Sequence, residues 1–225
     1  MARMARVVAP GYPHLLTQRG SGRLRAFFNG ADYLAYLNFM AEWCARCGVA
    51  VWAYCLMPNH VHLLAVPRTA GGLARAVGRA NRWHARQINF RQGRRGSLWQ
   101  GRFGSCVLDA QHALAAARYI ERNPVRAGLA KRAWDWPWSS AGAHVSGRGD
   151  VLIAAGGPLG AEVRDWRRLL SQEEDGEALA AFRSHLRTGR PLGDEVFVAG
   201  LETMLGRTLH RRKPGPAAGH KRGRR

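Results

Sequence analysis

The stretch Met57-Pro58-Asn59-His60-Val61-His62-Leu63-Leu64 decides the fold that we predict for this chain. Apolar runs flank it on both sides, and a proline followed by an asparagine is typical of a turn. The pattern therefore predicts two antiparallel strands, residues 49–56 and 60–66, joined as a tight hairpin. Side chains two residues apart leave the same face of a strand, so we expect His60 and His62 to share one face while the residues that alternate with them point into the core.

The two histidines have two interpretations. Two imidazoles on one face of a rigid strand form half of a metal site. The alternative is an ordinary polar face, because so short a motif often occurs by chance.

A second group of polar residues, Arg118 to Gly128, follows about sixty residues later. Tyr119 and Asn123 are four residues apart, which places them on one face of a helix. A tyrosine hydroxyl can act as a covalent nucleophile, and an amide oxygen can be a third metal ligand. The alternative is a packing tyrosine and an asparagine that ends a helix before Pro124.

The elements expected around the hairpin give the order β-α-β-β-α-β followed by a helix, which is the ferredoxin-like pattern. We therefore predict an α+β fold of the ferredoxin-like (RRM-like) type, an antiparallel sheet with helices on one face and the other face left for function. The other expected elements are a strand over 7–19, a helix from an Asp32 N-cap to Gly48, a helix over 71–90, a strand over 103–108 and a helix over 110–123.

The charge of the chain is high and unevenly distributed. Its 225 residues carry a formal net charge of +20. Most of the excess lies in residues 1–135 and in residues 207–225, whereas residues 136–206 have more acidic than basic side chains. Such concentrated positive charge favours a polyanionic partner, which we expect to be nucleic acid.

The same composition divides the chain into three parts. We expect a main domain over residues 1–145, a small helical C-terminal region over 146–206 and a basic tail over 207–225 that is disordered without a ligand. Three tryptophans between residues 134 and 138 are expected to pack the end of the main domain against its core.

Arginines on the helix over 71–90 are candidate contacts to the phosphates of a nucleic acid. They recur at positions i, i+4, i+7 and i+11, which is one stripe of a helix. Because no acidic residue occurs from residue 70 to residue 90, the stripe is not an intrahelical ion-pair ladder. We expect it to contact phosphates, with a solvated face as the alternative. The four residues are Arg75, Arg79, Arg82 and Arg86.

The loop over residues 91–102 mixes glycine and arginine around one aromatic ring. Unpaired bases stack on such rings while arginines hold the phosphates, so Arg94, Arg95, Trp99 and Arg102 are further candidate DNA contacts.

Several classes of protein are disfavoured. There is no apolar run of about 18 residues, which argues against a membrane span. The basic N-terminus lacks the apolar segment of a secretory signal, so we expect a cytoplasmic, nucleoid-associated protein. Cys44 and Cys47 form a C-x-x-C without a second pair, and we expect buried free thiols rather than a zinc or redox site.

Five segments, in this order and spacing, resemble the REP-associated tyrosine transposases, a branch of the HUH single-strand DNA transposases. The resemblance covers residues 7–145. The segments are Tyr12-Pro13-His14 with Thr17-Gln18-Arg19-Gly20, Leu56 to Leu64, Leu98-Trp99-Gln100-Gly101-Arg102-Phe103, Arg118 to Leu129, and Trp136-Pro137-Trp138-Ser139-Ser140.

The resemblance implies a function for each candidate residue. His60 and His62 would bind Mg²⁺ or Mn²⁺, and Asn123 would stand at the position of the third ligand. Tyr119 would attack a phosphodiester of single-stranded DNA, giving a 5′-phosphotyrosyl enzyme and a free 3′-hydroxyl without ATP. The DNA would be a hairpin, and the enzyme a monomer or a homodimer. The alternatives are a non-catalytic hairpin-binding protein or repressor, and a metal-dependent phosphodiester hydrolase.

Overall fold

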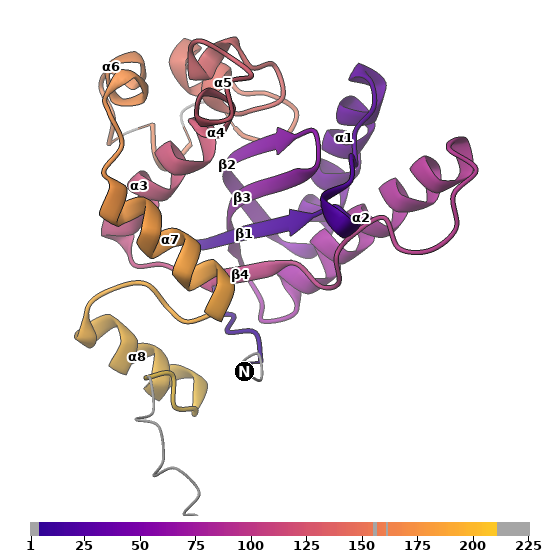
Figure 1. The fold of residues 1–225 in the computed structure, drawn as a ribbon. Coiled ribbons are helices and arrows are strands. Elements are labelled where there is room, and N and C mark those ends of the chain that lie inside the picture. Colours follow the sequence, from indigo (N-terminus) through magenta and orange to yellow (C-terminus); the bar gives the residue numbers. More distant parts are fainter. Residues whose placement is uncertain (1–4, 155–156, 161, 211–225) are drawn as a thin grey trace, which may run out of the picture.

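A four-stranded antiparallel sheet lies at the centre of the computed structural model, which describes residues 5–154, 157–160 and 162–210 (Figure 1). The strand order is β2-β3-β1-β4, which is the ferredoxin-like order, so the predicted α+β fold class is confirmed. The strands are β1 (His14–Arg19), β2 (Val49–Met57), β3 (His60–Pro67) and β4 (Gly104–Val107).

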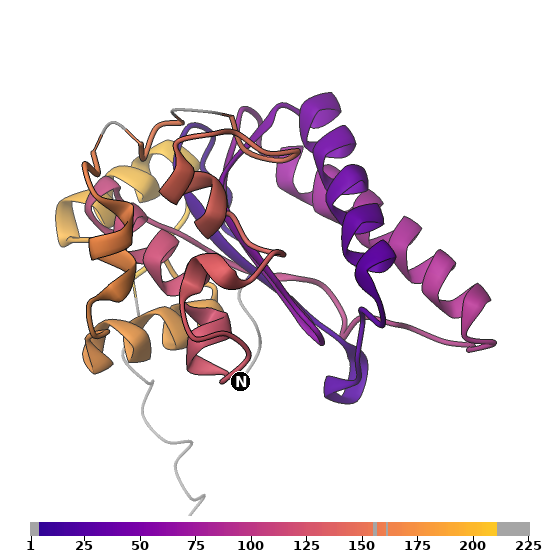
Figure 2. The same cartoon turned by 90° about the horizontal axis from the view of Figure 1, so that it is seen from above.

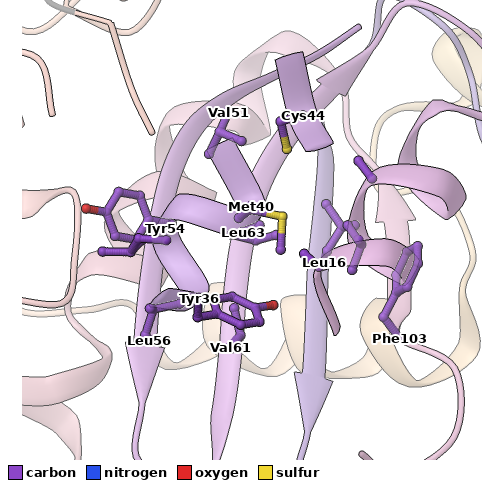
Figure 3. Packing of buried hydrophobic residues seen from close by; sticks show 14 of the residues in the cluster. Leu16, Tyr36, Met40, Cys44, Val51, Tyr54, Leu56, Val61, Leu63 and Phe103 are labelled. Carbon is purple, nitrogen blue, oxygen red and sulfur yellow. The ribbon is translucent and has the colours of Figure 1, made fainter. Parts of the chain in front are cut away.

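The predicted hairpin is confirmed, with Met57 opposite His60 at its closed end. Val61 and Leu63 of β3 enter the hydrophobic core on one side of the sheet, where Met40 of the first helix meets them (Figure 3). Leu64 enters a different core on the other side. The alternation expected of a strand therefore holds, and the second face of this strand carries Leu64 in addition to the two histidines.

Helices α1 (Gly30–Cys47) and α2 (Gly72–Arg91) lie side by side on the first face of the sheet (Figure 2). The predicted N-cap of α1 is wrong. Asn29 is the N-cap, and its side chain accepts from the backbone N–H of Asp32, whose carboxylate accepts in return from the backbone of Asn29. Asp32 is therefore the third helical residue of a capping box, and Arg91 of α2 pairs with its carboxylate at 2.5 Å.

The second face of the sheet is also covered, which corrects the expectation of helices on one face only. Leu15 and Leu64 of the sheet pack there with Ile120 and Phe182. The physical reason is that the central strands are apolar on both faces, and apolar area left in water would destabilise the fold. The helices of this side are α3 (Ala110–Glu121), α4 (Asn123–Arg126), α5 (Ala141–Ser146), α6 (Trp166–Ser171) and α7 (Gly176–Thr188).

The C-terminal region packs directly on the main domain. Leu192 donates to Val107 O at 2.9 Å and accepts from Asp109 N at 3.2 Å, which fixes the chain beside β4. Helix α8 (Glu195–Leu205) buries Leu201 against Val7. The boundary near residue 145 stays a prediction, and of the basic tail residues 211–225 lie outside the described residues.

Two further predictions can be compared with the structure. Trp138 stacks on Tyr33 with ring centroids 4.6 Å apart, and Trp136 donates to Leu56 O at 3.0 Å, so these tryptophans pack as expected. Within the described residues, none of the helices is both long enough and apolar enough to cross a bilayer. The two short 3₁₀ helices are η1 (Ser21–Arg23) and η2 (Ala133–Asp135).

Candidate active site

A cavity of 630 Å³ lies where β1, β3, the start of α4 and helix α7 meet. The residues that the sequence singled out for chemistry, His60, His62, Tyr119 and Asn123, all line it. The hairpin supplies the histidines and the α3–α4 segment supplies the other two side chains. The fold therefore brings the hairpin and the α3–α4 segment together at one cavity, whereas the sequence linked these two segments only through the family resemblance.

The two histidines lie next to each other in the lining of the cavity. Their ring centroids are 5.1 Å apart and their planes are nearly perpendicular. His60 Nδ1 lies 2.7 Å from Asn59 Oδ1, and Asn59 Nδ2 in turn donates to Arg23 O at 3.1 Å. This chain of contacts holds the His60 ring and leaves its other nitrogen available, which is the usual arrangement for a metal-binding histidine. The Asn123 amide lies within hydrogen-bonding reach of His60.

Both imidazoles are held in the neutral form. Burial lowers the pKa of His60 to about 4, and Arg19 and Arg126 add to this effect. Burial also lowers the pKa of His62 well below its ordinary value, with smaller contributions from His60 and from the same two arginines. Neutral imidazoles have the lone pairs that a metal requires.

The side chains at the cavity include possible ligands for a divalent cation. His62 Nδ1 is buried and has no hydrogen-bond partner within the described residues, and a metal ion bound there would satisfy its lone pair. The described chain contains no cluster of three or more His, Cys, Asp or Glu side chains suited to a metal. Asn123, which the family resemblance implies as the third ligand, lines the same cavity as the two histidines. Two imidazoles and one amide fit Mn²⁺ at least as well as Mg²⁺, which prefers oxygen.

Tyr119 lies against the histidine pair. Its ring centroid is 5.5 Å from that of His62, and the residue is 6% exposed. The Arg126 guanidinium lies 4.6 Å from the centre of the Tyr119 ring. Burial raises the pKa of the Tyr119 hydroxyl, while Arg126 and Arg183 act in the opposite direction. A potential nucleophile and the candidate metal ligands therefore occupy one cavity.

Arginines surround the cavity and make it suitable for an anion such as a phosphodiester. Only one of them was a sequence-based candidate, because the others lie on segments without a basic stripe. Arg183 and Arg187 share one face of α7 at a spacing of four, but this pattern alone does not show which cavity they line. The arginines lining the cavity are Arg19, Arg102, Arg126, Arg183 and Arg187.

The arginine stripe of α2 lies away from this cavity. Its side chains are exposed on a helix that covers the first face of the sheet, whereas Tyr119 belongs to the core on the second face. Arg94 and Arg95 are exposed in the loop that follows α2. These residues are accessible, and their DNA-binding role stays a prediction.

The prediction for Trp99 is corrected by the structure. The residue is 6% exposed, and its Nε1 donates to Asn81 O at 3.1 Å. Its ring contacts those of Phe27, Tyr36 and His84. The ring packs in the core beneath α1 and α2, because the indole buries more apolar area there than it would in an exposed loop. It is not available to stack on a base in this conformation.

Comparison with known proteins gives a family match and a shared fold. Residues 22–123 match the family described as Transposase IS200 like. A solved structure of a REP-associated tyrosine transposase bound to a REP hairpin shares the fold, with a TM-score of 0.53 and 20% sequence identity over 68% of this chain and 92% of that one. A putative transposase from Deinococcus radiodurans R1 gives a TM-score of 0.36 and 18% identity over 54% of this chain and 97% of that one.

No curated protein matches the chain. The likeness to the REP-associated transposase structure shows the fold, and the family match covers the strand that carries His60 and His62 together with Tyr119 and Asn123. Residues 22–123, which include the histidine pair, Tyr119 and Asn123, are therefore similar to the IS200-like transposases.

Proposed function

We propose that this protein is a metal-dependent tyrosine transposase that cleaves and rejoins single-stranded DNA beside a hairpin. The observation that carries the proposal is the meeting of Tyr119 with His60, His62 and Asn123 in one arginine-lined cavity. The solved structure with the same fold is bound to a REP hairpin, which supports a hairpin as the substrate here.

Tyr119 is the nucleophile in this proposal. Its hydroxyl oxygen attacks the phosphorus of the scissile phosphodiester and releases its proton to solvent, and the bond from phosphorus to the 3′-oxygen breaks. The 3′-oxygen leaves and takes up a proton as a free hydroxyl, while the 5′-phosphate stays on the tyrosine. Attack by a 3′-hydroxyl on the same phosphorus reverses these changes and rejoins the strand. The phosphotyrosine retains the phosphodiester bond energy, so ATP is not required.

The remaining groups have complementary roles. A divalent cation held by His60, His62 and Asn123 would polarise a non-bridging oxygen of the scissile phosphate. Arg19 and Arg102 at the cavity hold the anionic strand against Tyr119. The exposed arginines of α2 contact phosphates farther from the cleavage point in this proposal, because they lie on the opposite face of the sheet.

The test is a denaturing gel of the protein with labelled hairpin DNA and Mn²⁺. We expect a covalent protein–DNA adduct with the wild type and none with Tyr119→Phe, although Tyr119→Phe still binds the hairpin. Tyr12→Phe is a matched control, because Tyr12 packs on Phe197 outside the cavity with ring centroids 5.6 Å apart. Adduct formation by Tyr119→Phe would refute the assignment.

The same gel separates the two alternative functions. A hairpin-binding protein without chemistry would shift the DNA on a native gel and leave it intact on the denaturing gel. A hydrolase would cleave the DNA without a tyrosyl link, and its cleavage would survive Tyr119→Phe.

A further inference from the structure

The segment between α6 and α7 is tied to the chain on either side of Asn123 by a partly buried ion-pair cluster. Glu174 lies 3.3 Å from Arg122 Nε through one carboxylate oxygen and pairs with Arg126 through the other. Arg126 also donates to the backbone carbonyl oxygen of Tyr119 at 2.5 Å. One acidic residue of the C-terminal region thus fixes the arginine that lies over the Tyr119 ring.

Helix α7 itself makes two contacts with Tyr119. The Phe182 ring centroid is 5.3 Å from that of Tyr119, and Phe182 is 2% exposed. The next residue, Arg183, lines the same cavity as Tyr119 and interacts with its hydroxyl, which lowers the pKa of that hydroxyl. The phenyl contact is ordinary core packing. The arginine contact is different, because Arg183 is an exposed residue that packing does not require to point at a phenol.

We propose that α7 completes the active site: Arg183 is a catalytic residue that holds the Tyr119 hydroxyl oxygen in line with the scissile phosphorus, and Glu174 is a positioning residue that acts through Arg126. This inference rests on the proposed role of Tyr119 as nucleophile. Orientation matters here because a nucleophile displaced by about 1 Å loses on the order of a hundredfold in rate. A fixed guanidinium donor beside the attacked phosphate also stabilises the charge that develops on its oxygens.

The contact between Arg183 and the Tyr119 hydroxyl could either slow or accelerate the attack on DNA, and the rate of an Arg183 variant distinguishes these two effects. If the Arg183 guanidinium covers the hydroxyl and restrains it, its removal accelerates the reaction. If it positions the hydroxyl for attack, its removal slows the reaction.

The experiment compares Arg183→Gln and Arg183→Lys with the wild type in single-turnover adduct formation on hairpin DNA. With saturating DNA, we expect Arg183→Gln to lower the rate about tenfold to a hundredfold, while the Kd for uncleaved DNA changes only a few-fold. Arg183→Lys should restore part of the rate, since it keeps a charged donor. The matched control is Arg168→Gln, an exposed arginine of α6 outside the cavity, which should react at the wild-type rate.

A measurement independent of activity reports the contact itself. Nuclear magnetic resonance of protein with ring-labelled tyrosine gives signals from five tyrosines, and Tyr119→Phe identifies the signal of Tyr119. Arg183→Gln should move that signal, and Arg168→Gln should leave it in place.

The outcomes are distinguishable. Equal rates for Arg183→Gln and Arg168→Gln would overturn the inference, and so would a faster Arg183→Gln enzyme. If the wild type forms no adduct, the proposed function fails and the catalytic role of Arg183 falls with it. An active wild type whose Tyr119 signal does not respond to Arg183→Gln would overturn the positioning role alone.

Discussion

The change Glu174→Gln tests whether the C-terminal region stabilises the active site. The Glu174 side chain is 10% exposed, and those of Arg122 and Arg126 are 14% and 18% exposed. Removing the carboxylate leaves two largely buried guanidinium groups without their shared partner. Breaking a fully buried pair costs about 3–5 kcal/mol, and because these side chains retain some contact with water we expect about 2–3 kcal/mol.

Thermal unfolding measures this cost. For a chain of this size, 1 kcal/mol corresponds to a shift in Tm of roughly 2–4 °C, so Glu174→Gln should lower Tm by about 5–10 °C. Limited proteolysis should also cut the chain between α6 and α7 sooner, because this segment loses its anchor to α4. A slower rate of adduct formation should accompany both effects, since Arg126 loses the group that fixes it over Tyr119.

The neighbouring residue provides the control. Glu173 is exposed, and its backbone carbonyl rather than its carboxylate accepts from Arg118. Glu173→Gln removes the same charge from the adjacent position and should leave Tm within about 1 °C, as for other surface substitutions. Equal melting temperatures for the two variants would refute the claim that the Glu174 ion pairs stabilise this part of the protein.

Three further predictions concern stability and DNA binding. Burial lowers the pKa of His84 to about 4. Between pH 6.5 and pH 4 the unfolded chain therefore binds a proton at this residue and the folded chain does not, which lowers the free energy of unfolding by up to about 3 kcal/mol as the pH falls. Urea unfolding at several pH values should show that His84→Gln loses less stability on acidification than the wild type. The double change of Arg79 and Arg82 to Gln should reduce the slope of log K against log salt for hairpin binding by about 1.5, and an unchanged slope would remove α2 from the DNA interface. Trp99→Ala should cost about 3–5 kcal/mol in unfolding free energy while the folded fraction binds the hairpin as before, whereas weaker binding by fully folded protein would restore a role in base stacking.

The sequence by itself predicted what local periodicity encodes. The period of two in β3 separated His60 and His62 from Val61 and Leu63, and it did so because the geometry of an extended backbone is independent of the rest of the fold. The spacing of four between Tyr119 and Asn123 predicted that they share one side of a helical segment, and the structure shows that both line one cavity. The joint presence of these residues with the hairpin also carried the family resemblance, which residues 22–123 bear out.

The tertiary structure decided which elements cover each face of the sheet. The sequence left the second face open, because a run of apolar residues does not state which helix will bury it. The Phe182 side chain from α7 closes that face, and Arg183 next to it reaches the cavity as a consequence. Trp99 was predicted to be exposed and is buried. The sequence could not indicate this, because a single aromatic residue in an arginine-rich loop has no periodic pattern that signals burial. Contacts between segments far apart in the chain depend on the free energy of the whole packed arrangement, and only the folded structure shows how that balance was resolved.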